Sequence, residues 1–347
     1  MLVVSIKLWR WKNKSPSMKG GVLMSRNFKN IFFAVLVLIF GTTLAGCGQS
    51  NNAAQEQYLH MATGNTSGTY YPIGGAISEV LNQNIKNMHA GVQSTSGSVA
   101  NLQFLADGAV ELAIVQNDIA YYAVNGTEMF KDQNKYKFDT LRGLTALYPE
   151  SCQFVVLESS GIKSINDLKG KKVVVGAEGS GAEANARQIL EIYGLTYNDI
   201  EPQFLSFSVG AKALSEGTVD AAFLTAGFPT NAVQYAASQN KIKLLPIDDA
   251  HFVGLSEKYP FYTKITIPKG TYSGVDEDIQ TVSVMALLVC NDRVSNDTAY
   301  QVTKTIFEHL DKIKESHYAI SNLKKSEAEE GMTIKVQDGA DKFFKEN

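Results

Sequence analysis

The sequence predicts an α/β protein with two similar β-α-β-α-β lobes, mostly parallel sheets, a hinge and a cleft between the lobes. The main observation is an internal repeat, because residues 105–115 recur in pattern as residues 214–224. Each copy has the pattern of a helix end, a glycine at the stop and a buried strand. The two stop glycines, Gly108 and Gly217, are 109 residues apart. A unit of about 100 residues therefore occurs twice in the chain.

The segments around each copy repeat as well. Each begins with a short strand, a glycine-containing loop and a helix, followed by a second strand whose trailing serines are candidate N-caps. In the first copy these segments are residues 60–63, 64–68, 71–82 and 90–93. In the second copy they are residues 173–175, 176–181, 182–193 and 202–205. Strands that alternate with helices in this way require right-handed crossovers and parallel pairing.

The remaining segments complete the lobes. The chain is expected to leave lobe I near Tyr148, after a strand at residues 144–147, and to return near Phe261. The sequence then predicts a strand at 281–290 and an amphipathic helix at 299–313. It also predicts a charged, solvated C-terminal helix at 324–347, which Phe343 and Phe344 dock onto the lobe. Lobe I is thus predicted to comprise residues 58–147 and 262–347, and lobe II residues 148–261. Two or three crossings permit hinge closure.

The N-terminal segment is predicted to direct export. Residues 1–23 fit no part of a signal and are interpreted as an upstream mis-start, with translation beginning at Met24. A ten-residue apolar run follows Arg26 and Lys29, and this run is too short to cross a bilayer. The sequence Leu-Ala-Gly-Cys ending at Cys47 resembles the lipobox of bacterial lipoproteins. Residues 24–46 are therefore a predicted signal peptide, Cys47 the lipidated residue, and residues 47–57 a flexible tether.

Charge and cysteine usage exclude several classes of function. The 347-residue chain has a net charge of −3, but residues 1–46 contain seven basic and no acidic side chains, so the remainder carries −10. An acidic surface repels phosphate backbones, and nucleic-acid binding is not expected. Cys152 and Cys290 lie in apolar stretches and are predicted to be buried free thiols. The five histidines form no metal-ligand motif, so no metal is expected.

The loops predicted at the carboxyl ends of the strands are rich in glycine and small hydroxyl residues. Ligands of open α/β sheets bind at these ends. Several loops open helices, whose unpaired N–H groups and positive dipole ends favour an anion. The mature chain has only three arginines, Arg142, Arg187 and Arg293, so a carboxylate must rely largely on helix ends and hydroxyls, either alone or with one of these cations. The candidate ligand-binding residues are Ser67, Gly68, Tyr70, Thr95, Ser98, Asn101, Gln116, Glu150, Ser180, Gly181, Ser208 and Thr225. Glu150 either holds a ligand amine or contributes nothing.

An alternative prediction is a nucleotide-dependent enzyme. Residues 179–184 fit the pattern G-x-G-x-x-A, with Asp199 twenty residues beyond Gly179. However, the preceding strand ends at Gly176, Glu178 would repel a pyrophosphate, and an exported protein has no ready supply of the cofactor. No G-x-S-x-G or Walker pattern is present. The sequence therefore favours a protein without catalytic residues or cofactor.

Several motifs resemble the TAXI family of extracytoplasmic solute receptors for TRAP transporters. They are GNTSGTYYPIGG at 64–75, QSTSGSVANL at 93–102, VQND at 115–118, DLKGKKV at 167–173 with GSG at 179–181, and IPKGTY at 267–272. The resemblance runs from about Tyr58 to His309. It implies a type II periplasmic binding protein that delivers a small organic anion to a sodium-coupled permease, with no catalysis. Members are associated with glutamate, glutamine and related carboxylates. Other TRAP receptors clamp the carboxylate with an arginine, which has no obvious counterpart in these loops.

The sequence thus predicts a monomeric solute receptor, lipid-anchored on the outer face of the cytoplasmic membrane. It would capture a small carboxylate or amino acid and pass it to TRAP permease subunits. A second hypothesis is a ligand-sensing accessory protein for a membrane histidine kinase, which would use the same cleft and tether. A permease gene or a kinase gene beside this one would distinguish the two.

Replacing Cys47 with serine removes the predicted thioether anchor. We expect the C47S protein to appear in the medium or periplasm, because nothing else in the predicted tether holds it to lipid. Membrane fractionation and immunoblotting measure this. Retention of C47S in the membrane fraction would contradict lipidation at this residue.

Overall fold

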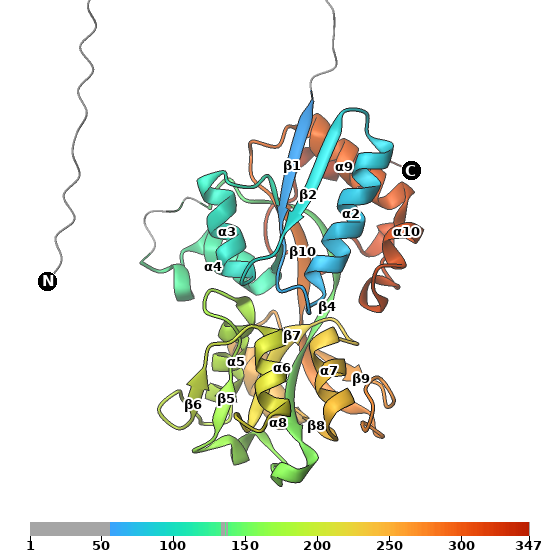
Figure 1. The fold of residues 1–347 in the computed structure, drawn as a ribbon. Coiled ribbons are helices and arrows are strands. Elements are labelled where there is room, and N and C mark those ends of the chain that lie inside the picture. Colours follow the sequence, from blue (N-terminus) through green and yellow to red (C-terminus); the bar gives the residue numbers. More distant parts are fainter. Residues whose placement is uncertain (1–55, 133–135, 137, 347) are drawn as a thin grey trace, which may run out of the picture. The chain divides into compact units, whose positions relative to one another are not determined.

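The computed structural model describes residues 56–132, 136 and 138–346. Cys47, the predicted start at Met24 and the predicted signal peptide lie outside the described residues. The unit Gln55–Asn347 is compact and contains two α/β lobes joined by long strands (Figure 1). Within the described part of the chain, no helix combines the length and the apolar character needed to cross a membrane.

The strands pair in the order β2-β1-β3-β10-β4-β7-β5-β6, with β8 added to β4 and β9 to β10. Because β4 and β10 are shared, the pairing continues from one lobe into the other (Figure 1). The strands are β1 Gln57–Ala62, β2 Met88–Gln93, β3 Leu112–Gln116, β4 Arg142–Leu157, β5 Lys172–Val174, β6 Glu201–Gln203, β7 Ala221–Ala226, β8 Ile242–Leu245, β9 Thr263–Ile267 and β10 Ile279–Cys290.

The two lobes have the same sheet topology. In lobe I, β1 pairs in parallel with β2 and β3, and the antiparallel β10 lies between β3 and β4. In lobe II, β5 pairs in parallel with β6 and β7, and the antiparallel β4 lies between β7 and β8. Four of these five strands run in one direction in each lobe. The predicted fold class, with twin α/β lobes and mostly parallel sheets, is confirmed.

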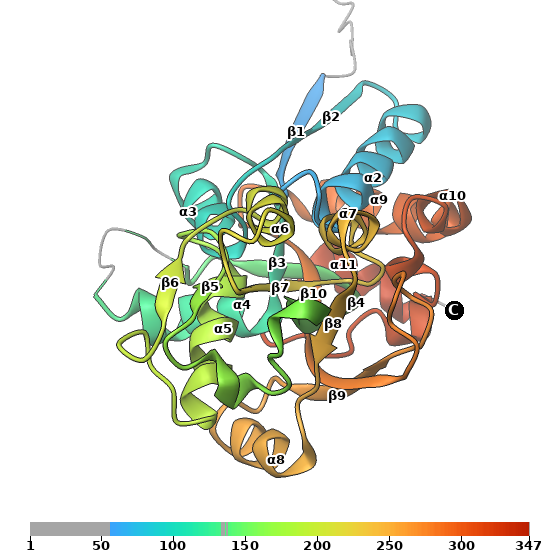
Figure 2. The same cartoon turned by 60° about the horizontal axis from the view of Figure 1, so that its bottom comes forward.

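Helices cover both faces of each sheet. Those of lobe I are α2 Tyr70–Asn84, α3 Ser98–Asp107, α4 Asn117–Asn125, α9 Asn296–Glu308, α10 Leu310–Lys314 and α11 Asp338–Lys345. Those of lobe II are α5 Gly181–Ile192, α6 Phe207–Ser215, α7 Asn231–Gln239 and α8 Asp249–Lys258. In Figure 2, α6 and α7 lie on one side of the lobe II strands and α8 on the other.

Apolar periodicity explains how the helices pack. In α2, Ile73, Ile77 and Leu81 recur at helical spacing and are fully buried against the lobe I sheet together with α9. The strand β3 is buried along its whole length, as expected for a strand covered on both faces. One apolar cluster includes α3 and α4 of lobe I and α5 of lobe II, so the two lobes share a core on this side.

The crossing strand β4 differs from the prediction. We expected a strand at residues 144–147 with Glu150 after it, whereas β4 runs without interruption from Arg142 to Leu157. Proline lacks an N–H donor and usually marks a strand boundary. Here Pro149 is exposed and stays in register opposite Met285 of β10, so pairing continues through it. Glu150 therefore lies within the strand that links the lobes.

The return crossing occurs later than residue 261. Ile267 at the end of β9 packs with Tyr272, Val275 and helix α7 in a lobe II cluster. The boundary predicted between residues 261 and 262 falls before this packing. The strand β10 carries the chain back, since it pairs with β9 at its start and with β3 at its end.

The C-terminal region also differs in part. The helix predicted at 299–313 is two helices, α9 and α10, which meet at His309. The segment 324–347 is not one helix. Most of it returns along lobe I, where the N–H of Ala146 donates to the carbonyl of Ala328 at 2.6 Å, and only Asp338–Lys345 forms an α-helix. The predicted docking is confirmed, because Phe343 and Phe344 both pack on Phe307.

Cys152 and Cys290 are buried free thiols, as predicted. Burial raises the pKa of Cys290 to about 12 and raises that of Cys152 still further. Both side chains therefore remain protonated and contribute to packing, not to reactivity.

Candidate functional site

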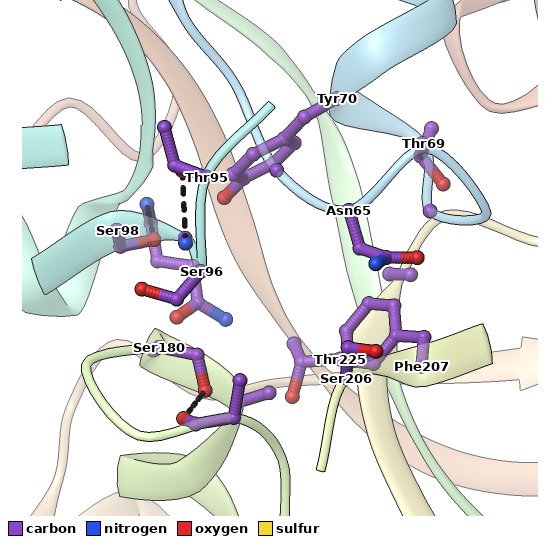
Figure 3. A pocket seen from close by; sticks show the side chains of 18 of the residues that line it. Asn65, Thr69, Tyr70, Thr95, Ser96, Ser98, Ser180, Ser206, Phe207 and Thr225 are labelled. Carbon is purple, nitrogen blue, oxygen red and sulfur yellow. Dashed lines mark hydrogen bonds between the residues drawn. The ribbon is translucent and has the colours of Figure 1, made fainter. Parts of the chain in front are cut away.

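A cavity that is partly open to solvent lies between the two lobes, and its empty space, open solvent included, is about 530 Å³ (Figure 3). Lobe I lines it with the loops that follow β1, β2 and β3, and lobe II with those that follow β5, β6 and β7. In Figure 3, Ser96 and Ser98 of lobe I face Ser180 of lobe II across this space. The carboxyl ends of the strands thus meet at one cleft, where ligands of such sheets bind.

Most of the predicted ligand-binding residues gather here. Nine of the twelve line the cavity, namely Gly68, Tyr70, Thr95, Ser98, Gln116, Glu150, Ser180, Gly181 and Thr225. They come from both lobes, and the structure therefore brings together loops that are more than 100 residues apart in the sequence. Their contact with a ligand stays a prediction.

The other three predicted residues are not among the cavity lining. Ser67 turns its hydroxyl to Asn65, and its carbonyl accepts from the N–H of Ala232 across the lobes. Asn101 is fully buried. Its amide donates to the carbonyls of Thr63 and Ile114, so it holds the strand ends in place.

Ser208 is the third predicted residue outside the cavity lining. Helix α6 begins at Phe207, its N-cap is Ser206, and Ser208 lies inside the first turn. Ser206 and Phe207 line the cavity. Both serines are N-cap candidates by sequence because serine is favoured at that position.

Ten further residues line the cavity mainly through their position and were not predicted from the sequence. They are Gly64, Asn65, Thr69, Ser96, Gly97, Ala177, Ala182, Ser206, Phe207 and Ala226. Most lie in or beside the loops already identified. A choice by side-chain chemistry passes over glycine and alanine, although these residues expose main-chain groups.

Five helices begin at the cavity wall. The N-cap residues of α2, α3, α4, α5 and α6 all line it, and they are Thr69, Gly97, Gln116, Ser180 and Ser206. Only the Ser180 hydroxyl, among these five, accepts a capping hydrogen bond, from the N–H of Glu183 at 3.2 Å. Helix starts leave N–H groups without helical partners and carry about half a positive charge each. These helix starts therefore direct partial positive charge of the main chain toward the cavity.

Basic side chains do not add to this potential. Among the described residues that line the cavity there is no lysine, arginine or histidine. Arg142 donates to the carbonyl of Asp139, Arg187 lies 3.5 Å from a Glu128 carboxylate oxygen, and Arg293 donates to the carbonyl of Ala106. This agrees with the expectation that helix ends and hydroxyls replace an arginine clamp.

Glu150 is the acidic residue of the cavity wall, and 2% of its surface is exposed. Its Oε1 accepts a hydrogen bond from the Tyr70 hydroxyl at 2.6 Å. Burial raises the pKa of the Glu150 carboxyl well above its ordinary value, and the Tyr70 hydrogen bond opposes this rise. An ionised Glu150 in the closed cleft therefore needs a positive group beside it.

Behind the cavity, a buried polar network joins α4 of lobe I to α5 of lobe II. The Asn185 amide group donates to Asp118 Oδ2 and to the Tyr262 hydroxyl, both at 2.8 Å. Its Oδ1 accepts from Gln116 Nε2 at 2.7 Å. The Tyr262 hydroxyl in turn donates to Gln188 Oε1 at 2.7 Å. All five side chains are buried, so the closed arrangement satisfies groups that would be costly to leave unpaired.

Main-chain contacts close the lobes around the cavity as well. The N–H of Ala100 donates to the carbonyl of Gly179 at 3.1 Å, and the Thr69 hydroxyl donates to the carbonyl of Gly227 at 3.2 Å. At Gly181 the fit leaves no room for a side chain, because a Cβ there would lie 1.4 Å from Gln116 Oε1. This oxygen is buried and has no hydrogen-bond partner within the described part of the chain.

The model of the NMT1-like family matches residues 61–347. The chain belongs to the NMT1-like family. A protein of Bordetella bronchiseptica RB50 is similar in structure, with a TM-score of 0.51, 16% identity, and coverage of 83% of this chain and 82% of that one. The alkanesulfonate-binding protein SsuA of Xanthomonas axonopodis pv. citri, solved with MOPS, has a TM-score of 0.46, 15% identity and 84% coverage of both chains. The aliphatic sulphonate binding protein SsuA of Escherichia coli has a TM-score of 0.43, 15% identity, and coverage of 76% and 75%.

The twin lobes and their shared strands give this chain the fold of the type II periplasmic binding proteins, as the sequence predicted. No group of three or more His, Cys, Asp or Glu side chains suited to a metal ion occurs among residues 56–132, 136 and 138–346.

The close contact between Gly181 and Gln116 predicts that a side chain at residue 181 prevents the two lobes from closing. Gly181 is the first residue of α5, a position that tolerates alanine, so G181A should fold normally while its Cβ keeps Gln116 at a distance. With a mixture of L-glutamate, L-glutamine and 2-oxoglutarate, small-angle X-ray scattering should show a fall in radius of gyration for the wild type but not for G181A. The control is G254A in α8, where a Cβ would have a neighbour at 3.6 Å. Equal compaction of G181A and the wild type would contradict this role.

The Asp118 carboxyl predicts a pH dependence. Burial raises its pKa from an ordinary 3.8 to about 6, although the hydrogen bonds from Asn185 and the N–H of Ile119 oppose the rise. The folded protein thus holds this proton more tightly than the unfolded chain. The stabilisation is fully present below about pH 4 and is lost as the pH rises through about 6.

Between pH 7 and pH 5, the free energy of unfolding of the wild type should therefore increase by about 1 kcal/mol relative to that of D118N. Urea denaturation of both proteins at both pH values measures this difference. Exposed carboxyl groups titrate in both proteins, so their contributions cancel in the difference between the two free energies of unfolding. Parallel pH profiles would show that Asp118 keeps an ordinary pKa.

Proposed function

We propose that this chain is an extracytoplasmic solute-binding protein of the TAXI type, without catalytic activity, that closes around a small carboxylate and delivers it to a TRAP-type sodium-coupled permease. The observation that carries this proposal is the convergence of five helix starts from both lobes on one cavity whose described lining holds no basic side chain. Such a site favours an anion through main-chain N–H groups. Four of the motifs that resemble TAXI receptors, at 64–75, 93–102, 115–118 and 179–181, contribute residues to the cavity wall.

Binding between lobes provides a signal to a transporter. A ligand shifts an equilibrium between open and closed forms only if it binds the closed form better. The candidate contacts come from both lobes, with Ser98 and Thr95 on one side and Ser180 and Thr225 on the other. Only the closed protein presents all of them to one molecule. A permease is then able to distinguish the loaded from the empty receptor.

The chemistry of the cavity supports binding without catalysis. Its described wall contains no histidine to act as a general base, and the buried Cys152 thiol below it has a raised pKa. The similar solved structures named above include binding proteins for sulfonates, which are also small organic anions. For this chain, carboxylates are favoured by the TAXI resemblance.

The proposed location follows from the leader. Export, lipidation at Cys47 and a short tether would hold a monomeric receptor at the outer face of the cytoplasmic membrane. There the cleft meets solutes before the permease does. We expect no nucleic-acid partner, because the acidic mature chain repels phosphate backbones.

Isothermal titration calorimetry of the protein tests this function. We expect at least one of L-glutamate, L-glutamine, 2-oxoglutarate and succinate to bind with a Kd of about 10 μM or less, as about 7 kcal/mol of binding free energy would give. The same acid should raise the melting temperature, because it binds only the folded form. NAD is the control ligand. Failure of every small acid together with tight binding of NAD would replace the receptor with the enzyme hypothesis.

A further inference from the structure

Glu150 is out of place in a cavity that binds anions. Five helix starts direct partial positive charge toward the cavity, yet the ionisable acid in its described wall is the Glu150 carboxyl group, with 2% exposure. A second carboxylate, brought by a ligand, would place two negative groups in one small cleft, beside a carboxyl group that is itself buried. Such a pair is strongly unfavourable unless a proton or a cation lies between them.

The surroundings of Glu150 leave part of the carboxyl free for a ligand. Among the described residues, the Tyr70 hydroxyl is the hydrogen-bond donor to this group, and it uses Oε1. The carboxylate of Asp118 lies close enough to raise the pKa of Glu150 further, so the described neighbours supply negative charge and no cation. Ionised Glu150 therefore requires a positive group that the ligand itself brings.

A second acceptor points to the same kind of ligand. Gln116 lines the cavity, and its buried Oε1, which packs against Gly181, has no hydrogen-bond partner within the described chain. Its Nε2 donates to Asn185. An oxygen without a donor is costly in a closed site. Gln116 and Glu150 lie on the two strands that flank β10, at the floor of the cleft, whereas the free N–H groups lie at the helix starts. The cavity thus offers both acceptors and donors to one molecule.

Resting on the receptor function proposed above, we propose that Glu150 accepts the ammonium group of the ligand, and that the ligands are therefore α-amino acids and not plain carboxylic acids. The carboxylate of the amino acid lies at the helix starts, and its ammonium group donates to Glu150. An ammonium group has three N–H donors, which matches a site with several oxygen acceptors. Tyr70 is a positioning residue, since its hydroxyl fixes the orientation of the Glu150 carboxyl.

Matched pairs of ligands test this assignment. The purified protein is titrated with L-glutamate and 2-oxoglutarate, L-alanine and pyruvate, and L-leucine and 4-methyl-2-oxopentanoate. Each pair differs in the ammonium group alone among its charges. The wild type should bind the amino acid of at least one pair about 10- to 100-fold more tightly than its 2-oxo partner, as a charge-assisted hydrogen bond predicts.

The variant E150Q keeps an oxygen acceptor for Tyr70 but loses the charge. E150Q should lower the affinity for that amino acid about 10- to 100-fold. Its affinity for the 2-oxo acid should stay within about threefold of the wild-type value or increase. A structural defect would weaken both ligands alike. Y70F tests the positioning role and should reduce the same preference by a smaller factor. The control is E158Q, which removes an exposed carboxylate 3.6 Å from Lys243 at the far end of β4.

The outcomes separate the two proposals. If 2-oxo acids bind the wild type as tightly as their amino acids, or if E150Q keeps the wild-type preference, Glu150 does not accept an ammonium group and the inference is wrong, while the receptor function stands. If E150Q fails to fold, the inference is tested by the ratio of amino-acid to 2-oxo-acid affinity in the wild type and by its change in Y70F. If neither member of any pair binds, in this panel and in the one above, the proposed function itself fails.

Discussion

The N–H groups at the starts of α2 to α6 are the constraint on which this cleft depends. They have no helical partners, and their dipoles add up in a small space between two lobes. This arrangement explains why the loops are rich in glycine, serine and threonine, because larger side chains would cover the main chain. It also explains how an anion site forms without a lysine or an arginine in its described wall. Glu150 then limits which anions fit.

Closure joins the lobes through apolar and polar contacts. One apolar cluster includes α3 and α4 of lobe I and α5 of lobe II. Asn185 of α5 also bonds to Asp118 and Gln116 across the lobes. Hydrogen bonds that exchange with water contribute little net free energy. A ligand that contacts both lobes shifts the equilibrium toward the closed form. The glycine at residue 181 lets the two lobes approach to this distance.

The internal repeat predicted most of the fold, because helix ends, stop glycines and buried strands have strong local signals. The continuity of β4 had no such signal, because Pro149 suggests that the strand ends there. That Pro149 is exposed and stays paired with β10 is visible only in the structure. For the cavity, the loops were predicted correctly but not every residue. Ser208 was chosen in place of Ser206 because N-caps are uncertain by a residue or two, and glycine and alanine have no side-chain signal at all.

A crystal structure of the protein with a bound amino acid or carboxylate tests the central claim most directly. The account predicts that the ligand carboxylate lies within hydrogen-bond distance, about 2.7–3.2 Å, of main-chain nitrogens in the first turns of helices from both lobes, such as α3 and α5. A ligand held by one lobe alone, or by a lysine or arginine side chain outside this cavity, would contradict it.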